Sequence, residues 1–160
     1  MYFGTENFLH LNYTPTTTAM NNFPILIIED DKDDCDFILE AVTDTGIENK
    51  IHCFSSPIPA LEYLRTTEEI PLLIICDINL PEMNGLAFKR IINGDALLNN
   101  KRIPFVFLST SSHGYLVDEA FNLSVQGYFK KPQTSNDYRI LTKSIIQYWL
   151  NSKLPQAVTS

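Results

Sequence analysis

Short apolar runs recur along this chain, and each is followed by a longer segment whose apolar residues have helical spacing. The runs are Ile25 to Ile28, Ile51 to Phe54, Leu72 to Cys76, Phe105 to Leu108 and Gly127 to Phe129. Most of them are continuously apolar, which is typical of strands that are covered on both faces. Strands that alternate with helices pair in parallel. The pattern therefore predicts an α/β fold with a buried parallel sheet.

Five helices are expected to follow these strands. The first has an acidic first turn at Asp33 and Asp34, and Gly46 is placed to end it. The third is expected from Gly85 to Leu98, and the fourth is expected to begin at a cap formed by Ser111 or Ser112. The second and fifth have apolar positions at Ala60, Leu61 and Leu64 and at Ile140, Leu141, Ile145, Tyr148 and Trp149. Five βα units in this order predict a doubly wound sheet, whose ligands bind beyond the carboxyl ends of the strands.

The length of 160 residues fits a single domain with a full-sized core. We expect a flexible leader at residues 1–22, a folded domain at residues 23–150 and a tail at residues 151–160. The net charge of −7 argues against direct binding to nucleic acid, which depends on clustered Lys and Arg. The longest strongly apolar stretch, Pro71 to Cys76, is far shorter than the roughly 18 residues of a membrane helix, and the N-terminus lacks the features of a signal peptide. We therefore expect a cytoplasmic protein that does not bind a membrane.

The three cysteines do not form a recognisable motif. Cys35, Cys53 and Cys76 are odd in number and widely spaced, so they provide neither a CxxC redox motif nor a paired-cysteine zinc site. We expect them to be reduced thiols of the core.

Polar side chains follow four of the five predicted strands. They are Glu29, Asp30 and Asp31 after the first strand, Asp77 after the third, Ser109 and Thr110 after the fourth, and Lys130 and Lys131 after the fifth. The carboxyl ends of parallel strands meet at one edge of the sheet, so these side chains are expected to converge. Neighbouring carboxylates repel one another unless a cation neutralises them, and all-oxygen ligands favour a hard ion such as Mg²⁺. A metal site is therefore predicted at this edge.

Each acidic residue also has an ordinary structural interpretation. Asp33, Asp34 and Asp36 fit a solvated helix start, which the helix dipole favours, and we prefer that interpretation for them. Asp77 could cap a helix or form a turn, yet it ends a buried strand and is expected to face two further acids and a lysine. That setting favours a chemical role for Asp77.

The order of these residues resembles the receiver domain of two-component response regulators. The motifs that carry the resemblance are Glu29-Asp30, Asp77 followed by Pro81 and Gly85, Ser109, and Lys131-Pro132. It covers roughly residues 24–150, which is nearly all of the expected folded domain. The resemblance implies a flavodoxin-like sheet of five parallel strands in the order 2-1-3-4-5, flanked by five helices.

The same resemblance assigns roles to the strand-end residues. It implies that Asp77 accepts a phosphoryl group from a sensor histidine kinase or a histidine phosphotransfer protein. Mg²⁺ or Mn²⁺ would be held by Asp30, by Asp77, by the backbone carbonyl of Asn79 and, through water, by Glu29. Lys131 would bind a phosphoryl oxygen, and the Lys131–Pro132 peptide bond is expected to be cis. Lys130 competes for this role, but strand alternation would turn it the other way.

The resemblance also implies a switch. Ser109 would bind the phosphorylated form, and Tyr128 would turn inward as the hydroxyl moves, although Tyr128 also fits a core aromatic with a polar group. Asn79 and Ser111 would flank the phosphoryl group and modulate its loss. The face made by the fourth helix, the fifth strand and the fifth helix would then bind a downstream protein. The chain would catalyse only its own phosphorylation and dephosphorylation, without acting otherwise as an enzyme.

Two alternatives remain at this point. The first is a metal-dependent phosphohydrolase with an Asp nucleophile, whose pattern places a second acid two residues on, where this chain has Asn79. The second is a degenerate receiver that binds partners without being phosphorylated. The complete set of Glu29, Asp30, Asp77 and Lys131 argues against that second interpretation, because a scaffold does not need mutually repelling charges.

Overall fold

The structure is a computed structural model of the chain, and it describes residues 23–154. Its strands are β1 (Ile25–Ile28), β2 (Ile51–Phe54), β3 (Leu73–Cys76), β4 (Phe105–Ser109) and β5 (Gly127–Lys130). They form one parallel sheet in the order β2-β1-β3-β4-β5, which confirms the expected topology. The strand bounds differ from the expected ones by at most one residue. The leader at residues 1–22 and the end of the tail at residues 155–160 lie outside the described residues.

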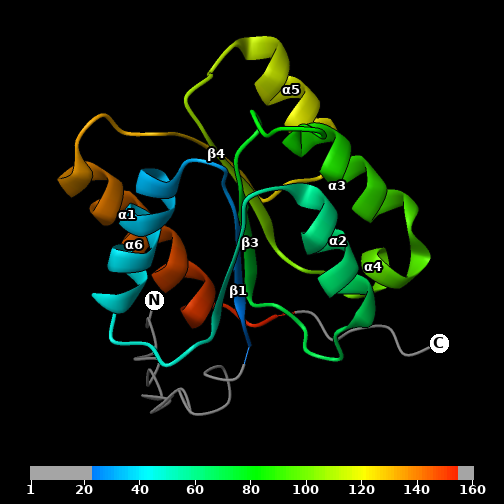
Figure 1. Cartoon of the computed structure of the whole chain (residues 1–160), viewed down its shortest axis with the longest axis horizontal. Helices are drawn as coiled ribbons and strands as arrows, with labels where there is room; N and C mark the ends of the chain where they lie inside the picture. The colour runs from blue at the N-terminus through cyan, green and yellow to red at the C-terminus, as the bar shows by residue number, and fades with distance from the viewer. Residues whose placement is uncertain (1–22, 155–160) are drawn as a thin grey trace, which may run out of the picture.

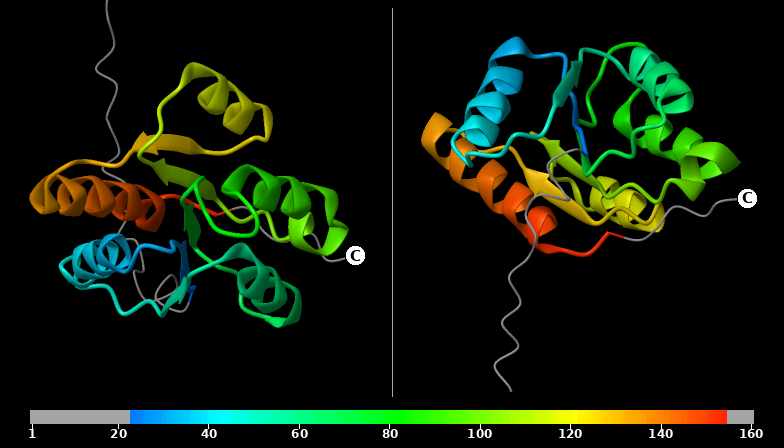
Figure 2. Two further views of the ribbon diagram at one scale, coloured as in Figure 1. Left: turned by 45° about the horizontal axis from the view of Figure 1, so that its top comes forward. Right: turned by 90° about the horizontal axis from the view of Figure 1, so that it is seen from below.

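Helices cover both faces of the sheet, as a doubly wound fold requires (Figures 1 and 2). Their bounds are α1 (Lys32–Thr43), α2 (Pro57–Thr66), α3 (Gly85–Gly94), α4 (Ala96–Asn100), α5 (Gly114–Asn122) and α6 (Ser135–Asn151). The first and last of them, α1 and α6, pack against one face, and the other four lie on the opposite side (Figure 1). Beyond the end of α6, Leu154 still packs against the core, so ordered packing continues past the expected domain end at residue 150.

The prediction of five helices is wrong for residues 23–154, because the expected helix from Gly85 to Leu98 is two helices. Asp95 separates them with an extended backbone (φ −92°, ψ 113°). Its N–H donates to Ile91 O at the end of α3, and its carboxylate accepts from the N–H groups of Leu97 and Leu98 at the start of α4. An Asp that caps a new helix directly after Gly94 ends the first helix, since both residues disfavour a helix interior.

The predicted cap of the fourth helix is also wrong. His113 is the N-cap residue of α5, and its side chain makes no capping hydrogen bond. Ser111 and Ser112 stay in the preceding loop, where the Ser111 carbonyl accepts a hydrogen bond from the Tyr128 hydroxyl at 2.5 Å. The loop is therefore held by β5 and not by a serine cap.

The core has two layers, one on each side of the sheet. Alternate residues of β1 face opposite layers, with Leu26 and Ile28 toward α2 and α3 and with Ile25 and Ile27 toward α1 and α6. Both β1 and β3 are fully buried, which confirms the prediction for the central strands. At the edge of the sheet, β2 is only half-buried.

The strand order reverses at β1, so the carboxyl ends of β1 and β3 form the switch point of the sheet. From β1 the chain continues to β2 on one side, whereas β3 lies on the other side of β1 and leads on to β4. Ligands of doubly wound sheets bind at such a switch point. Between residues 23 and 154, the helices are too short or too polar to cross a membrane.

Candidate functional site

Three carboxylates meet at the switch point because of the strand register. Ile28 of β1 pairs with Cys76 of β3, so the residues that follow them, Glu29 and Asp77, emerge side by side. One carboxylate oxygen of each of these residues and of Asp30 lies within 4.8 Å of the others. Glu29 and Asp77 are buried, whereas Asp30 is exposed. All-oxygen ligands at this spacing fit a hard divalent cation.

Lys131 supplies the positive charge of this group. Its Nζ lies 2.7 Å from Glu29 Oε2, 2.7 Å from Asp77 Oδ2 and 2.8 Å from Asp34 Oδ2. Its backbone N–H donates to Ser109 O at 2.8 Å, which fixes the start of the chain segment after β5. Lys131 is buried, whereas its neighbour Lys130 is exposed. The structure therefore brings Lys131, and not Lys130, to the carboxylates.

The expected cis peptide bond before Pro132 is wrong for this structure, because the Lys131–Pro132 bond is trans. Lys131 is held through its side chain by the three carboxylates and through its main chain by Ser109. Those contacts position the ammonium with the ordinary trans peptide geometry.

Burial and the neighbouring charges act in opposite directions on the pKa of Lys131 and on the pKa of Glu29. Burial opposes the ammonium of Lys131, but hydrogen bonds from it to Asp34, Asp77 and Glu29 outweigh this and raise its pKa, so it stays charged. Burial raises the pKa of Glu29 to about 7, and the charge of Asp77 adds to the rise, while Lys131 acts against it. The charge of Glu29 therefore depends on the cations near it.

Backbone groups orient the Asp77 carboxylate. Its Oδ1 accepts from Ile78 N at 2.6 Å and from Asn79 N at 3.2 Å, while Oδ2 faces Lys131. The loop then folds back so that Gly85 N donates to Ile78 O at 2.9 Å. A Cβ atom at Gly85 would lie 2.3 Å from Asp77 O, so a larger residue does not fit there. This explains why the segment behind Asp77 ends in glycine.

The expected switch residues form a second group beside the first. Ser109 is fully buried at the end of β4, and its Oγ is 3.4 Å from the N–H of Ser111, a long contact. The Tyr128 hydroxyl donates to Ser111 O, and its ring packs against Phe107 with centroids 6.2 Å apart. Thr110 is exposed. Ser109, Ser111 and Tyr128 therefore share one hydrogen-bonded loop.

Sequence reasoning missed the role of Asp34. We expected a solvated carboxylate at the helix start, yet Asp34 binds the Lys131 ammonium. The capping function belongs to Asp31, which accepts from the N–H groups of Asp33 and Asp34. No local pattern indicates this contact, because it depends on how far the Lys131 side chain extends toward the first turn of α1.

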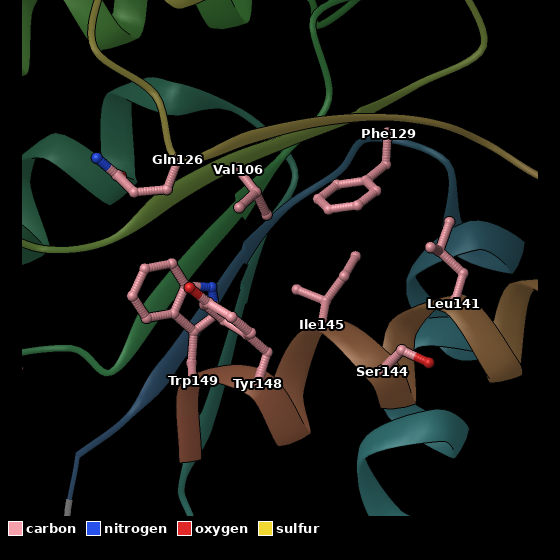
Figure 3. A pocket seen from close by; sticks show the side chains of 8 residues that line it. All are labelled: Val106, Gln126, Phe129, Leu141, Ser144, Ile145, Tyr148 and Trp149. Carbon is pink, nitrogen blue, oxygen red and sulfur yellow. The ribbon is translucent and has the colours of Figure 1, made fainter. Parts of the chain in front are cut away.

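An apolar groove of about 410 Å³ lies away from the charged group, between the sheet and α6 (Figure 3). It is lined by Val106, Gln126, Phe129, Leu141, Ser144, Ile145, Tyr148 and Trp149. Val106 and Gln126 lie near the starts of β4 and β5, at the edge opposite the acidic residues. The groove and the charged site are therefore separate features of the fold.

Comparison with known proteins identifies the family to which this fold and site belong. Residues 25–143 match the family model described as the response regulator receiver domain. The chain therefore belongs to the response regulator receiver family. It is also 30% identical, over 139 residues, to the response regulator Rcp1 of Synechocystis sp., covering 83% of this chain and 93% of that protein.

Solved structures of response regulators have the same fold. The phosphorylated cyanobacterial phytochrome response regulator RcpA is similar with a TM-score of 0.77 and 30% identity, covering 84% of this chain and 99% of that one. The Mn²⁺-bound form of Rcp1 is similar with a TM-score of 0.76 and 28% identity, with the same coverage of both chains.

Proposed function

We propose that Asp77 is the phosphoryl acceptor of a response regulator receiver spanning residues 23–150, and that its donor is a phosphohistidine of a sensor kinase or phosphotransfer protein. The observation that carries this proposal is the setting of the Asp77 carboxylate. Two backbone N–H groups orient Oδ1, Lys131 faces Oδ2, and two further carboxylates lie within 4.8 Å. A buried carboxylate with a fixed orientation is suited to attack phosphorus in line.

Glu29, Asp30 and Asp77, with the backbone carbonyl of Asn79, are the proposed ligands of Mg²⁺ or Mn²⁺. The cluster of carboxylate oxygens supports this, as does the Mn²⁺-bound structure of Rcp1. When bound, the cation would neutralise negative oxygens of the transferring phosphoryl group, which is the main requirement of phosphoryl transfer. Three carboxylates contact the one ammonium, and Asp30 adds a fourth near Glu29 and Asp77, so the site has an excess of negative charge that a cation would relieve.

Lys131 is proposed to exchange a carboxylate partner for a phosphoryl oxygen. Its ammonium already contacts the Asp77 oxygen that would carry, or lie next to, the new phosphoryl group. Because the ammonium is also held by Glu29 and Asp34, it can release Asp77 Oδ2 without losing all of its partners. Lys131 then stabilises negative charge on the phosphoryl group as that charge enters the site.

Ser109 and Tyr128 are proposed to relay the change, with Asn79 and Ser111 modulating loss of the phosphoryl group. The Ser111 loop supports this, since it is held by the Tyr128 hydroxyl and approaches the Ser109 hydroxyl. Movement of Ser109 toward a phosphoryl oxygen would disturb the loop that holds Tyr128. The relay would then be a shift between two arrangements of one hydrogen-bonded loop.

The proposed output surface is the face of α5, β5 and α6, which corresponds to the fourth helix, fifth strand and fifth helix of the sequence analysis. Large apolar side chains are exposed on both helices, namely Tyr115, Phe121, Ile140 and Tyr148. The apolar groove beside β5 and α6 adds to this surface (Figure 3). Tyr128 lies on β5, so the proposed relay reaches this face directly. A downstream protein is the proposed partner.

Phosphorylation by a small donor tests the central proposal. The wild type, incubated with acetyl phosphate and Mg²⁺, should gain the mass of one phosphoryl group, and a chelator should prevent the gain. Asp77→Asn should gain nothing. Asp36→Asn is the matched control. It makes the same chemical change at a carboxylate that pairs with the exposed Lys32 and lies outside the proposed site. An unmodified wild type, or an Asp77→Asn protein that gains equal mass, contradicts the proposal.

The site favours this function over a phosphohydrolase. The residue two positions after Asp77 is Asn79, whose N–H binds the Asp77 carboxylate and whose side chain is no general acid. Turnover of an exogenous phosphate ester by the purified protein would support the hydrolase instead.

A further inference from the structure

Two of the cysteines lie against each other although they are far apart in the sequence. Cys35 is in the first turns of α1 and Cys53 is in the edge strand β2, 18 positions later. Their Sγ atoms are 2.9 Å apart, with the Cys35 thiol donating to the sulfur of Cys53. A disulfide bond has an S–S distance of about 2.05 Å, so less than about 1 Å of approach separates these thiols from a bond.

The fold itself produces this contact. Cys53 pairs with Ile27 in the parallel register, so both side chains point to the face of the sheet that α1 covers. Cys35 is buried in the same layer, whereas Cys53 is exposed because β2 is at the edge of the sheet. Cys76 is completely buried in the opposite layer and does not belong to the pair.

We propose that Cys35 and Cys53 are a redox modification site, at which a small-molecule disulfide such as oxidised glutathione forms a reversible bond between α1 and β2. The exposed Cys53 thiolate attacks one sulfur of the oxidant and forms a mixed disulfide with it. The bond between the two oxidant sulfurs breaks, and the other sulfur leaves as a thiolate that takes up a proton. The Cys35 thiolate then attacks the Cys53 sulfur of the mixed disulfide and releases the second small thiol. The protein loses two electrons and two protons, and the oxidant becomes two thiols.

The chemistry of the two thiols sets the order of these steps. Burial raises the pKa of Cys35 to about 12. Burial also raises the pKa of Cys53, but the hydrogen bond from Cys35 acts against that rise. Cys53 therefore reacts first, since it is more accessible and its thiolate is stabilised by its neighbour. Because disulfides are rare in reducing compartments unless they are transient, such a bond would respond to oxidising conditions there.

Alkylation after oxidation tests the proposal. Wild-type protein is incubated with excess oxidised glutathione, unfolded, treated with iodoacetamide and analysed by intact mass and peptide mapping. We expect one alkylated cysteine, Cys76, and a cross-linked peptide pair that contains Cys35 and Cys53. Dithiothreitol should restore three alkylated cysteines. A wild type that keeps all three thiols, or a cross-link that includes Cys76, overturns the proposal.

Single variants separate the two steps. Cys35→Ser should stop at the mixed disulfide, with glutathione retained on Cys53. Cys53→Ser, an exposed substitution, should take up neither a cross-link nor glutathione at Cys35. A glutathione adduct on Cys35 in that variant, or an internal cross-link in Cys35→Ser, contradicts the proposed order. The Asp77→Asn protein should form the cross-link to the same extent as wild type, so this proposal and the phosphorylation proposal fail independently.

Discussion

Two buried lysines lie at opposite edges of the same sheet, and their surroundings affect their charge in opposite directions. Lys131 contacts three carboxylates at the carboxyl edge, and these raise its pKa although burial alone would lower it. Lys89 of α3 lies with Nζ 5.1 Å from the centre of the Phe105 ring, near the start of β4. Burial lowers the pKa of Lys89 to about 8. Burial is common to both residues, so the carboxylates make the difference.

This contrast shows which charge the fold supports. A buried ammonium is unfavourable unless charged partners offset its loss of hydration, and a ring offsets only part of it. Lys131 is kept charged where the proposed phosphoryl group would arrive. Lys89 lies in α3, where burial makes its charge unfavourable. The same substitution at each position should therefore have opposite effects.

The largest effect is expected from Lys131→Met. Without the ammonium, the buried carboxylates of Glu29 and Asp77 repel each other, and the metal-free protein should lose about 3 to 5 kcal/mol of unfolding free energy. The loss should grow as the pH rises from 6 to 8. Burial already raises the folded pKa of Glu29 to about 7 in the wild type, and loss of the ammonium, which acts against that rise, raises the pKa further. The folded variant therefore holds a proton that the unfolded state has released, and it loses stability as that proton leaves with rising pH. Urea denaturation at several pH values measures this, and an unchanged midpoint would show that the charges are not coupled.

A divalent cation should sharpen the contrast, because it should bind the carboxylates beside Lys131 and leave Lys89 unaffected. Mg²⁺ at about 100 times its dissociation constant should stabilise the folded protein by about 2.7 kcal/mol if it binds only that state. Asp30→Asn, which changes the exposed ligand of the site, should weaken this stabilisation, while Lys89→Met should leave it intact. Thermal unfolding with and without Mg²⁺ provides the measurement. An equal effect of Mg²⁺ on all three proteins argues against cation binding at the carboxylates.

Lys89→Met should stabilise the protein by about 2 kcal/mol at pH 7, because each unit of lowered pKa corresponds to about 1.4 kcal/mol and the ring contact offsets part of the total. The sign with pH follows from the lowered pKa. Between about pH 8 and the ordinary value of 10.5, the unfolded state keeps the Lys89 proton and the folded state does not, so wild-type stability rises with pH. The advantage of the variant should therefore be complete below pH 8 and shrink above it. A midpoint difference that stays constant from pH 7 to pH 10 would falsify the assignment.

Much of the fold and the centre of the candidate site could be predicted from the sequence, for physical reasons. Buried parallel strands are continuously apolar, so the sequence predicts β1 and β3. The polar residue after each of them marks the edge where ligands bind. The sequence pattern does not predict the break between α3 and α4 at Asp95, because the apolar spacing continues across it. One hydrogen-bonded cap determines that a new helix begins there.

The Cys35 contact and the third partner of Lys131 also escaped prediction, because both join residues that only the packing of α1 brings to the sheet. The Sγ contact depends on how α1 crosses β2, and the Asp34 ion pair depends on how far Lys131 extends. Local patterns report which face a residue occupies, and they do not report how closely two elements approach.

The smallest effect is expected from Asp34→Asn, which tests how many carboxylates keep Lys131 charged. The Asp34 side chain is 25% exposed, and Glu29 and Asp77 remain as partners, so the loss should stay below about 1 kcal/mol. Phosphoryl uptake from acetyl phosphate should persist, because Asp77 keeps its backbone contacts and its lysine. Asp33→Asn, an exposed neighbour in the same turn, is the matched control for the helix dipole. If Asp34→Asn destabilised the protein as much as Lys131→Met, the ammonium would depend on Asp34 alone, and the two buried carboxylates would not account for the difference between the two lysines.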